Sequence, residues 1–259
     1  MSEKETKFYT EVIDLPSRGW FYPETNPLSS GQVELYYMTA KHEDILTSRN
    51  LIQKGIVIDK LLEALIVNPQ VKMNDLLLGD KTAIMVASRI LGYGKDYEVN
   101  VTCPSCGNRS AHTMNLEQTG DKECKFFTDE HRGQNAFPFE LPMTKKTVIF
   151  RYLTHGDEKA VRAEISGLQK AMKLKHIDRE VTTRLKRSIL SVDGDEDGET
   201  VRQFVDSMPA RDAMALRQYI RDTGPDVDLT SEYTCEECNY EGRVEIPIDL
   251  NFFWPNIGV

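Results

Sequence analysis

Four of the five cysteines form two CxxC pairs, and their thiolates are the side chains best placed to do chemistry. Cys103 and Cys106 form one pair, and Cys235 and Cys238 form the other. A CxxC turn presents two sulfur ligands to one ion, and two such turns complete a tetrahedral zinc site. We therefore predict one structural zinc ion per chain. Protein ligands then fill all four positions, so no water can bind the ion and no Lewis-acid chemistry is expected.

The CxxC pairs have two other interpretations, a disulfide within each pair and a redox dithiol. A redox CxxC normally opens a helix, whose N-terminus lowers the thiol pKa. Both pairs here are instead flanked by short alternating segments typical of strands, including 112–116 and 243–248. An odd number of cysteines and a charged N-terminus without an apolar signal core favour a reducing compartment, where disulfides are rare. The fifth cysteine, Cys124, is expected to be an ordinary free or half-buried thiol.

The surroundings of the two cysteine pairs resemble each other, which indicates an internal duplication. Residues 98–106 read EVNVTCPSC, and residues 230–238 read TSEYTCEEC. Farther upstream, LYYMTAKHEDIL at 35–46 corresponds to FRYLTHGDEKAV at 150–161. Each half is therefore expected to run as a strand, two or three helices, a strand, a CxxC knuckle and a further strand.

The expected fold is α+β, with two related helix-and-strand halves joined by a shared, zinc-ribbon-like pair of knuckles. The predicted divisions are an extended N-terminal arm at 1–30, a first half at 31–118 with Cys103 and Cys106, a linker at 119–146, a second half at 147–250 with Cys235 and Cys238, and an aromatic C-terminal tail at 251–259. Helices are predicted at 40–52, 57–67 and 80–91, and at 157–174, 177–191 and 199–220, the last broken near Pro209.

The composition is that of an ordinary globular protein and argues against several kinds of partner. Of 259 residues, 40% are hydrophobic and 28% charged, and the net charge is −9. An acidic chain is poorly suited to a phosphate backbone, so no nucleic-acid partner is expected. The densest basic stretch, 170–187, carries apolar residues at helical spacing and is interpreted as the solvated side of a helix. No apolar run reaches the ~20 residues that cross a bilayer, so no membrane partner is expected.

No motif in the sequence predicts an enzyme. The five histidines are scattered, no Ser/His/Asp arrangement is evident, and no glycine pattern predicts a nucleotide site, so no small-molecule substrate is expected. The acidic segment Asp193–Glu199 resembles the start of a calcium loop, but Phe204 stands where the bidentate carboxylate should be. A solvated acidic turn is therefore favoured over a cation site.

Two aromatic clusters are candidate contact sites for other proteins. Trp20, Phe21 and Tyr22 stand between two prolines near the N-terminus, and Phe252, Phe253 and Trp254 stand close to the C-terminus. Such side chains either pack against the core of their own chain or anchor a neighbour. Core packing is favoured for Trp20, whereas both interpretations remain open for the C-terminal cluster.

Several segments together resemble the baseplate hub proteins of T-even-type contractile-tailed phages, the family that includes the hub assembly protein. These segments are LPSRGWFYP, LYYMTAKHEDIL, LLLGDKTAIMVASRILGYG, the CPSC knuckle and FPFELPMTKKTVIFRYLTHGDE. The resemblance implies a structural or assembly subunit of the virion tail baseplate, put together in the host cytoplasm. It also implies that the partners are other baseplate hub and tail proteins, or a second copy of the chain.

A second class of function stays open, that of a zinc-ribbon protein that binds nucleic acid or assists transcription. The cationic side chains near the knuckles are Lys95, Arg109 and Arg243. Glutamates at 98, 236, 237 and 241 oppose them, and this balance is poor for phosphate contact. Salt-dependent DNA or RNA binding at physiological ionic strength would favour this alternative.

Overall fold

The protein is described by a computed structural model, which covers residues 9–172, 179–248 and 250–254. The start of the predicted arm, the predicted helix start at Ile177 and the end of the predicted tail lie outside the described residues. Helices and small antiparallel sheets are mixed along the chain, which confirms the predicted α+β class. In the parts of the chain that are described, no helix has the length and apolarity needed to cross a membrane.

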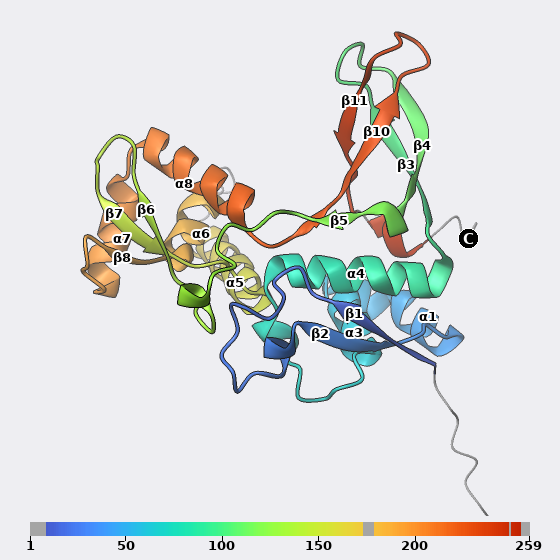
Figure 1. Ribbon diagram of the computed structural model, residues 1–259, viewed down its shortest axis with the longest axis horizontal. Coiled ribbons are helices and arrows are strands. Elements are labelled where there is room, and N and C mark those ends of the chain that lie inside the picture. Colours follow the sequence, from blue (N-terminus) through green and yellow to red (C-terminus); the bar gives the residue numbers. More distant parts are fainter. Residues whose placement is uncertain (1–8, 173–178, 249, 255–259) are drawn as a thin grey trace, which may run out of the picture.

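The N-terminal lobe combines one β-hairpin with four helices (Figure 1). Its elements are β1 (Thr10–Asp14), β2 (Gln32–Tyr36), α1 (Ala40–Leu46), α2 (Arg49–Gln53), α3 (Val57–Leu65) and α4 (Leu78–Tyr93). The predicted helix at 40–52 is therefore two short helices, separated at Thr47–Ser48. In α3, Val57, Leu61 and Leu65 are buried at a spacing of four residues, so one face of the helix packs on the core.

The C-terminal lobe is built on a three-stranded sheet in the order β6-β7-β8. Its elements are β6 (Phe137–Glu140), β7 (Thr147–Phe150), α5 (His155–Met172), α6 (Glu180–Ser188), β8 (Ile189–Val192), α7 (Gly198–Ser207) and α8 (Ala210–Thr223). The predicted break near Pro209 separates α7 from α8. The Asp197 carboxylate accepts hydrogen bonds from the N–H groups of Glu199 and Thr200 and caps α7.

Two further hairpins rise together from the lobes and form what we call the tower, residues 96–115 and 230–245 (Figure 1). Its strands are β3 (Asp96–Thr102), β4 (Arg109–Asn115), β10 (Thr230–Thr234) and β11 (Glu241–Glu245). A short ladder between β5 (Gly120–Asp121) and β9 (Val227–Asp228) joins the chain segments below it. Single 3-10 turns occur at Pro27–Ser30, Met73–Asp75, Leu116–Gln118, Asp129–His131 and Leu250–Phe253.

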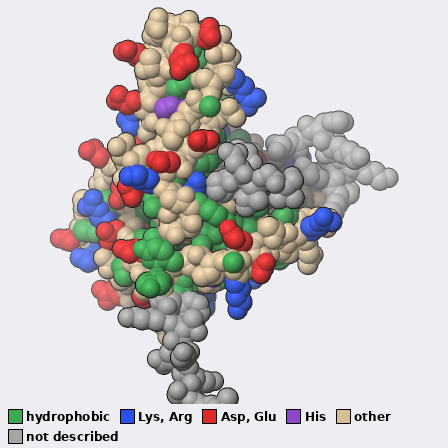
Figure 2. Space-filling view, turned by 90° about the vertical axis from the view of Figure 1, so that its right-hand side faces the viewer, with side chains coloured by type: hydrophobic (Ala, Val, Ile, Leu, Met, Phe, Trp, Pro, Cys, Tyr) green, Lys and Arg blue, Asp and Glu red, His purple; other side chains and the backbone are tan. Residues whose placement is uncertain are grey.

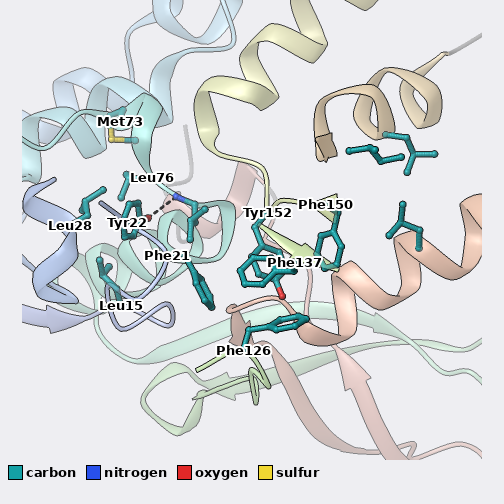
Figure 3. Close-up of a cluster of buried hydrophobic side chains, with 14 of the residues drawn as sticks. Leu15, Phe21, Tyr22, Leu28, Met73, Leu76, Phe126, Phe137, Phe150 and Tyr152 are labelled. Atoms are coloured by element: carbon teal, nitrogen blue, oxygen red, sulfur yellow. Dashed lines mark hydrogen bonds between the residues drawn. The ribbon is translucent and has the colours of Figure 1, made fainter. Parts of the chain in front are cut away.

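The main core lies between the two lobes and is rich in aromatic rings (Figure 3). Phe21, from the predicted arm, lies 5.1 Å from Phe137 between ring centroids, and Phe126 lies 4.4 Å from Phe137. Phe126 and Phe137 belong to the segment predicted as a linker at 119–146, which also supplies strand β6. That segment therefore builds part of the sheet and the core in addition to connecting the lobes.

In the hairpin at the start of each lobe, the first strand leads into the same kind of turn. β1 leads into Leu15–Pro16 and β6 into Leu141–Pro142. The Leu15 N–H donates to the Gly31 carbonyl at 2.8 Å, and the Leu141 N–H donates to the Lys146 carbonyl at 2.9 Å. Gly31 and Lys146 come directly before β2 and β7, so each turn is closed by a backbone hydrogen bond at the start of the next strand.

Candidate metal centre

The four paired cysteines meet at the tip of the tower. Their sulfur atoms all lie within 4.8 Å of one another, with 3.7 Å between Cys103 and Cys238 and 3.7 Å between Cys106 and Cys235. All four are free thiols, because a disulfide would bring two sulfurs to about 2.05 Å. Around a zinc ion with Zn–S bonds of about 2.3 Å, neighbouring sulfurs of a tetrahedron lie about 3.8 Å apart. The donor set and its spacing therefore fit a tetrahedral metal centre with four sulfur ligands.

The two knuckles are the same turn. In each, the first cysteine donates its N–H to a carbonyl five residues on and accepts an N–H from four residues on. These bonds are Cys103 to Asn108 (2.8 Å), Gly107 to Cys103 (3.0 Å), Cys235 to Tyr240 (2.9 Å) and Asn239 to Cys235 (2.9 Å). The turn needs a left-handed residue, which is Gly107 (φ 75°) in one knuckle and Asn239 (φ 53°) in the other. Glycine and asparagine are the residues that adopt this conformation most readily.

The site has the geometry of a two-fold arrangement. Cys103 and Cys235, the first cysteine of each knuckle, are buried, and Cys106 and Cys238 are exposed. Each buried cysteine lies next to the exposed cysteine of the other knuckle, at the same distance. Neither knuckle can complete the ligand set alone, so a bound ion would tie together segments 132 positions apart in the sequence.

The electrostatics of the four thiols also favour a cation. The N–H groups of Cys238 and Glu237 donate to the Cys235 sulfur and lower its pKa to about 6. The N–H of Asn108 lowers the pKa of Cys106, but hydrogen bonds with the neighbouring thiols outweigh it and raise this pKa to about 12. One thiolate therefore forms easily, while further deprotonation is opposed. A bound dication would offset half of the charge of four adjacent thiolates and so favour their deprotonation.

Side-chain contacts below the tip hold the two hairpins in register. The Ser110 hydroxyl lies 2.9 Å from the Tyr233 hydroxyl, and His112 Nε2 lies 3.0 Å from the Ser231 hydroxyl. The His112 ring packs edge-on against Tyr233, with 5.7 Å between centroids. These contacts join β4 to β10 and hold the two knuckles beside each other.

The remaining candidate residues lie away from this centre. Cys124 is half-buried, and burial raises its pKa. In the acidic segment, Asp193 pairs with Lys146 at 2.7 Å, and Asp195 and Asp197 accept backbone N–H groups of their own turn. Among the described residues, the four tower cysteines form the one cluster of potential metal ligands with suitable spacing. The acidic segment is thus built as a capped turn.

The aromatic candidates pack on the chain itself. Phe21, Tyr22, Phe252 and Phe253 are buried, and Phe252 packs edge-on against Tyr97 beneath the tower at 5.0 Å. These four side chains pack against the chain's own core, and their surfaces are already covered within the chain. Trp20 and Trp254 are partly exposed, and for them a contact with a neighbour remains a prediction.

Sequence reasoning missed two buried aspartates that anchor the Leu-Pro turns. Asp80, in the first turn of α4, accepts the Ser17 N–H at 2.9 Å, the Ser17 hydroxyl at 2.7 Å and the Tyr22 hydroxyl at 2.5 Å. Asp212, in the first turn of α8, accepts the N–H groups of Met143 at 2.7 Å and Thr144 at 3.0 Å. The signal in the sequence was the spacing, because Asp80 and Asp212 are 132 residues apart, as are Cys103 and Cys235.

Comparison with known proteins identifies the family to which the chain belongs. Residues 22–254 match the family model described as T4 bacteriophage base plate protein. The chain therefore belongs to this family of phage baseplate proteins, which confirms the resemblance seen in the sequence. The matched range includes both lobes and all four tower cysteines. No curated protein and no solved structure matches the chain.

Proposed function

We propose that this baseplate protein is a structural or assembly subunit of the tail hub, and that one zinc ion fastens its tower. The observation that carries the proposal is the meeting of four free cysteine sulfurs at tetrahedral spacing in a member of the family. Cys103, Cys106, Cys235 and Cys238 would hold the ion, and with four protein sulfurs the ion supplies structure without catalysis. The subunit would act through contacts with other hub and tail proteins during assembly in the host cytoplasm.

The zinc ion would stabilise the tower because it closes a long loop of chain. Bringing together segments 132 residues apart costs conformational entropy, and a cross-link that binds only the folded state offsets that cost. The tower projects from the lobes, and Figure 2 shows it from one side with acidic side chains over its surface. Among the described residues, the exposed large apolar side chains all lie outside the tower. Val101, Tyr233 and Val244 are buried together between the hairpins below the tip, and the ion would fix the two knuckles above them.

We further propose that the two halves are related by internal duplication. Three corresponding features support this idea: the Leu-Pro turn after the first strand, the buried aspartate that accepts N–H groups of that turn, and the CxxC knuckle. They occur in the same order in both halves. On this interpretation each half begins with β1 or β6, within the segments first predicted as an arm and a linker.

The zinc proposal is tested by elemental analysis of the purified chain. We expect about one zinc per chain, and four of the five thiols should be protected from reagent until a chelator is added. Cys124→Ser is the matched control, because it removes a thiol outside the tower. A metal-free protein in which all five thiols react would contradict the proposal.

The assembly role is tested in the phage. We expect deletion of the gene to stop the formation of infectious tails, and the replacement of both Cys103 and Cys235 by serine to weaken assembly. Mass spectrometry of finished tails and of baseplate intermediates would show whether the subunit stays in the particle. Normal numbers of complete, infectious tails without the gene would contradict the role.

A further inference from the structure

We infer that the seam between α4, α6 and α8 is a docking site for an acidic segment of a partner protein that inserts one large apolar side chain. The inference rests on the proposed role as a subunit acting through protein contacts, and it does not involve the metal. Three features of the described residues carry it: an apolar cavity, close-packed walls from both lobes, and two exposed arginines at its rim, Arg217 without a carboxylate partner and Arg221 with one at 3.9 Å.

The cavity has a volume of about 260 Å³ and lies where the lobes meet. Its apolar lining comes from Leu77, Leu78, Tyr152, Leu153, Leu185 and Ile220. Ligand pockets for whole small molecules usually measure about 300–1,000 Å³. This cavity is smaller, which suits a single inserted side chain. Leu78, Leu153 and Ile220 are only partly buried, so apolar surface remains open at the mouth.

The walls of the cavity are fixed by close contacts between the lobes and within the C-terminal lobe. Gly79 packs so tightly that an added Cβ would lie 1.9 Å from the Pro225 carbonyl oxygen. On the other side, the Tyr152 hydroxyl donates to the Thr223 carbonyl at 2.8 Å. The backbone bond from the Leu78 N–H to the Leu153 carbonyl, at 3.3 Å, joins the two lobes at the mouth. The site is therefore preformed, so a binding partner does not lose affinity to the ordering of its walls.

The cavity is lined by three arginines and by one carboxylate, Asp226, which pairs with Lys122 at 3.3 Å, in a chain whose net charge is −9. Arg184 is neutralised by Glu158 at 2.7 Å and Glu180 at 2.8 Å. Arg217 has only the Ala213 carbonyl as a hydrogen-bond partner among the described residues, at 3.2 Å. Arg221 lies 3.9 Å from the carboxylate of Asp222, its neighbour in sequence, and both side chains are exposed.

Arg217 and Arg221 lie one turn apart on α8, so both guanidinium groups can serve one acidic segment. Guanidinium groups bind carboxylates through two parallel hydrogen bonds. Arg217, which has no carboxylate partner among the described residues, and Arg221, which has one at 3.9 Å, therefore favour an apolar side chain flanked by aspartate or glutamate. Two arginines are too few to hold a nucleic-acid backbone against the negative field of the whole chain.

The test uses the full-length, zinc-loaded protein and fluorescent peptides in which one leucine or phenylalanine is flanked by two glutamates on each side. We expect fluorescence anisotropy to show binding of both peptides. Replacing the apolar residue by alanine, or the glutamates by glutamines, should weaken binding at least about tenfold. The double variant Arg217→Glu/Arg221→Glu should weaken it by a similar factor, as should Leu153→Glu at the mouth.

The matched control is Arg49→Glu/Arg109→Glu, which reverses two exposed arginines elsewhere and should leave affinity within about twofold. Unchanged melting temperature and zinc content exclude misfolding as the cause of any loss. Absence of binding at millimolar peptide, or equal binding by the α8 double variant, would overturn the inference. Binding of decanoate alone, or self-association abolished by Arg217→Glu, would assign the cavity to a small acid or to a second copy and would also overturn it. These outcomes leave the baseplate role to its own test in assembled tails.

Discussion

Asp80 and Asp212 occupy equivalent places, in the first turn of a long helix beneath a Leu-Pro turn, yet their surroundings differ. Burial raises the pKa of Asp80 to about 6, and the hydrogen bonds from Tyr22 and Ser17 offset it only in part. Burial also acts to raise the pKa of Asp212, but the N–H groups of Met143 and Thr144 outweigh it and lower this pKa. Asp80 is covered by the buried side chain of Tyr22, whereas Asp212 lies beneath a turn in which Met143 is exposed.

The surroundings of the two knuckles, in contrast, are alike. Corresponding residues make the same backbone hydrogen bonds, and corresponding cysteines are buried or exposed to the same degree. The metal centre that we propose would require equal geometry from both knuckles, whereas each lobe can surround its aspartate in its own way. Variants at corresponding positions can therefore test which positions the proposed metal constrains and which depend on local packing.

The largest expected effect comes from the buried cysteines. Cys103→Ser and Cys235→Ser should each abolish stoichiometric zinc binding and lower the free energy of unfolding by about 4 kcal/mol or more. Because the two sulfurs are equivalent, their effects should agree within about 1 kcal/mol. Zinc analysis and denaturant unfolding measure both quantities. Loss of metal in one variant and full retention in the other would refute the two-fold arrangement.

Substitution of the two buried aspartates, unlike that of the two cysteines, should lower the free energy of unfolding by different amounts. Asp80→Ala leaves two hydroxyls and one N–H without an acceptor in the core and should cost about 3–5 kcal/mol. Asp212→Ala leaves the N–H groups of Met143 and Thr144 without their acceptor. Met143 is 60% exposed, so water can replace the carboxylate there. Its cost should be about 1–2 kcal/mol. Equal costs in urea unfolding would show that the two surroundings do not matter.

The contributions of Asp80 and Asp212 to the free energy of unfolding should change with pH in opposite directions. The raised pKa of Asp80 means that its stabilising contribution is complete below about pH 4 and is lost as pH rises through about 6. The lowered pKa of Asp212 means that its contribution is present above about pH 4 and is lost as pH falls.

Unfolding curves of the wild type, Asp80→Asn and Asp212→Asn between pH 4 and 7 test these signs, and differences from the wild type remove any common effect of the metal. The wild type should lose stability relative to Asp80→Asn as pH rises, by roughly 2–3 kcal/mol at most. Relative to Asp212→Asn it should gain little between pH 4 and 7, because this contribution is lost only as pH falls below about 4. The same sign for both differences would contradict the pKa assignment.

The smallest expected effect lies at the left-handed residue of each knuckle. Gly107→Asn and Asn239→Gly exchange the two residues and should each change stability by less than about 0.5 kcal/mol. Gly107→Ala and Asn239→Ala should each cost about 1 kcal/mol, because alanine disfavours a positive φ. Thermal unfolding resolves these differences. A large penalty for the exchange would show that the two turns are not interchangeable.

Much of the fold follows from local sequence patterns. The spacing of apolar residues predicted most of the helical segments, although residues 189–191, expected at the end of a helix, lie in strand β8. Pro209 predicted the break between α7 and α8, and the cysteine spacing predicted which side chains would meet. The strand β6 was missed because Gly, Pro and charged residues around it are typical of a linker. Its sheet forms only by pairing with β7 and β8.

The buried aspartates could not be predicted from local pattern, because their partners are 63 and 69 residues away. An aspartate in the first turn of a helix is ordinarily a solvated residue that favours the helix dipole. Only the fold decides that Asp80 is enclosed by Ser17 and Tyr22. The docking cavity likewise depends on how the lobes meet, which no single segment encodes.

X-ray absorption at the zinc edge of the purified protein tests most directly whether one ion is held jointly by both knuckles. The account predicts four sulfur neighbours at about 2.3 Å and no nitrogen or oxygen ligand. Two sulfurs completed by lighter atoms, or a protein purified without zinc, would contradict it.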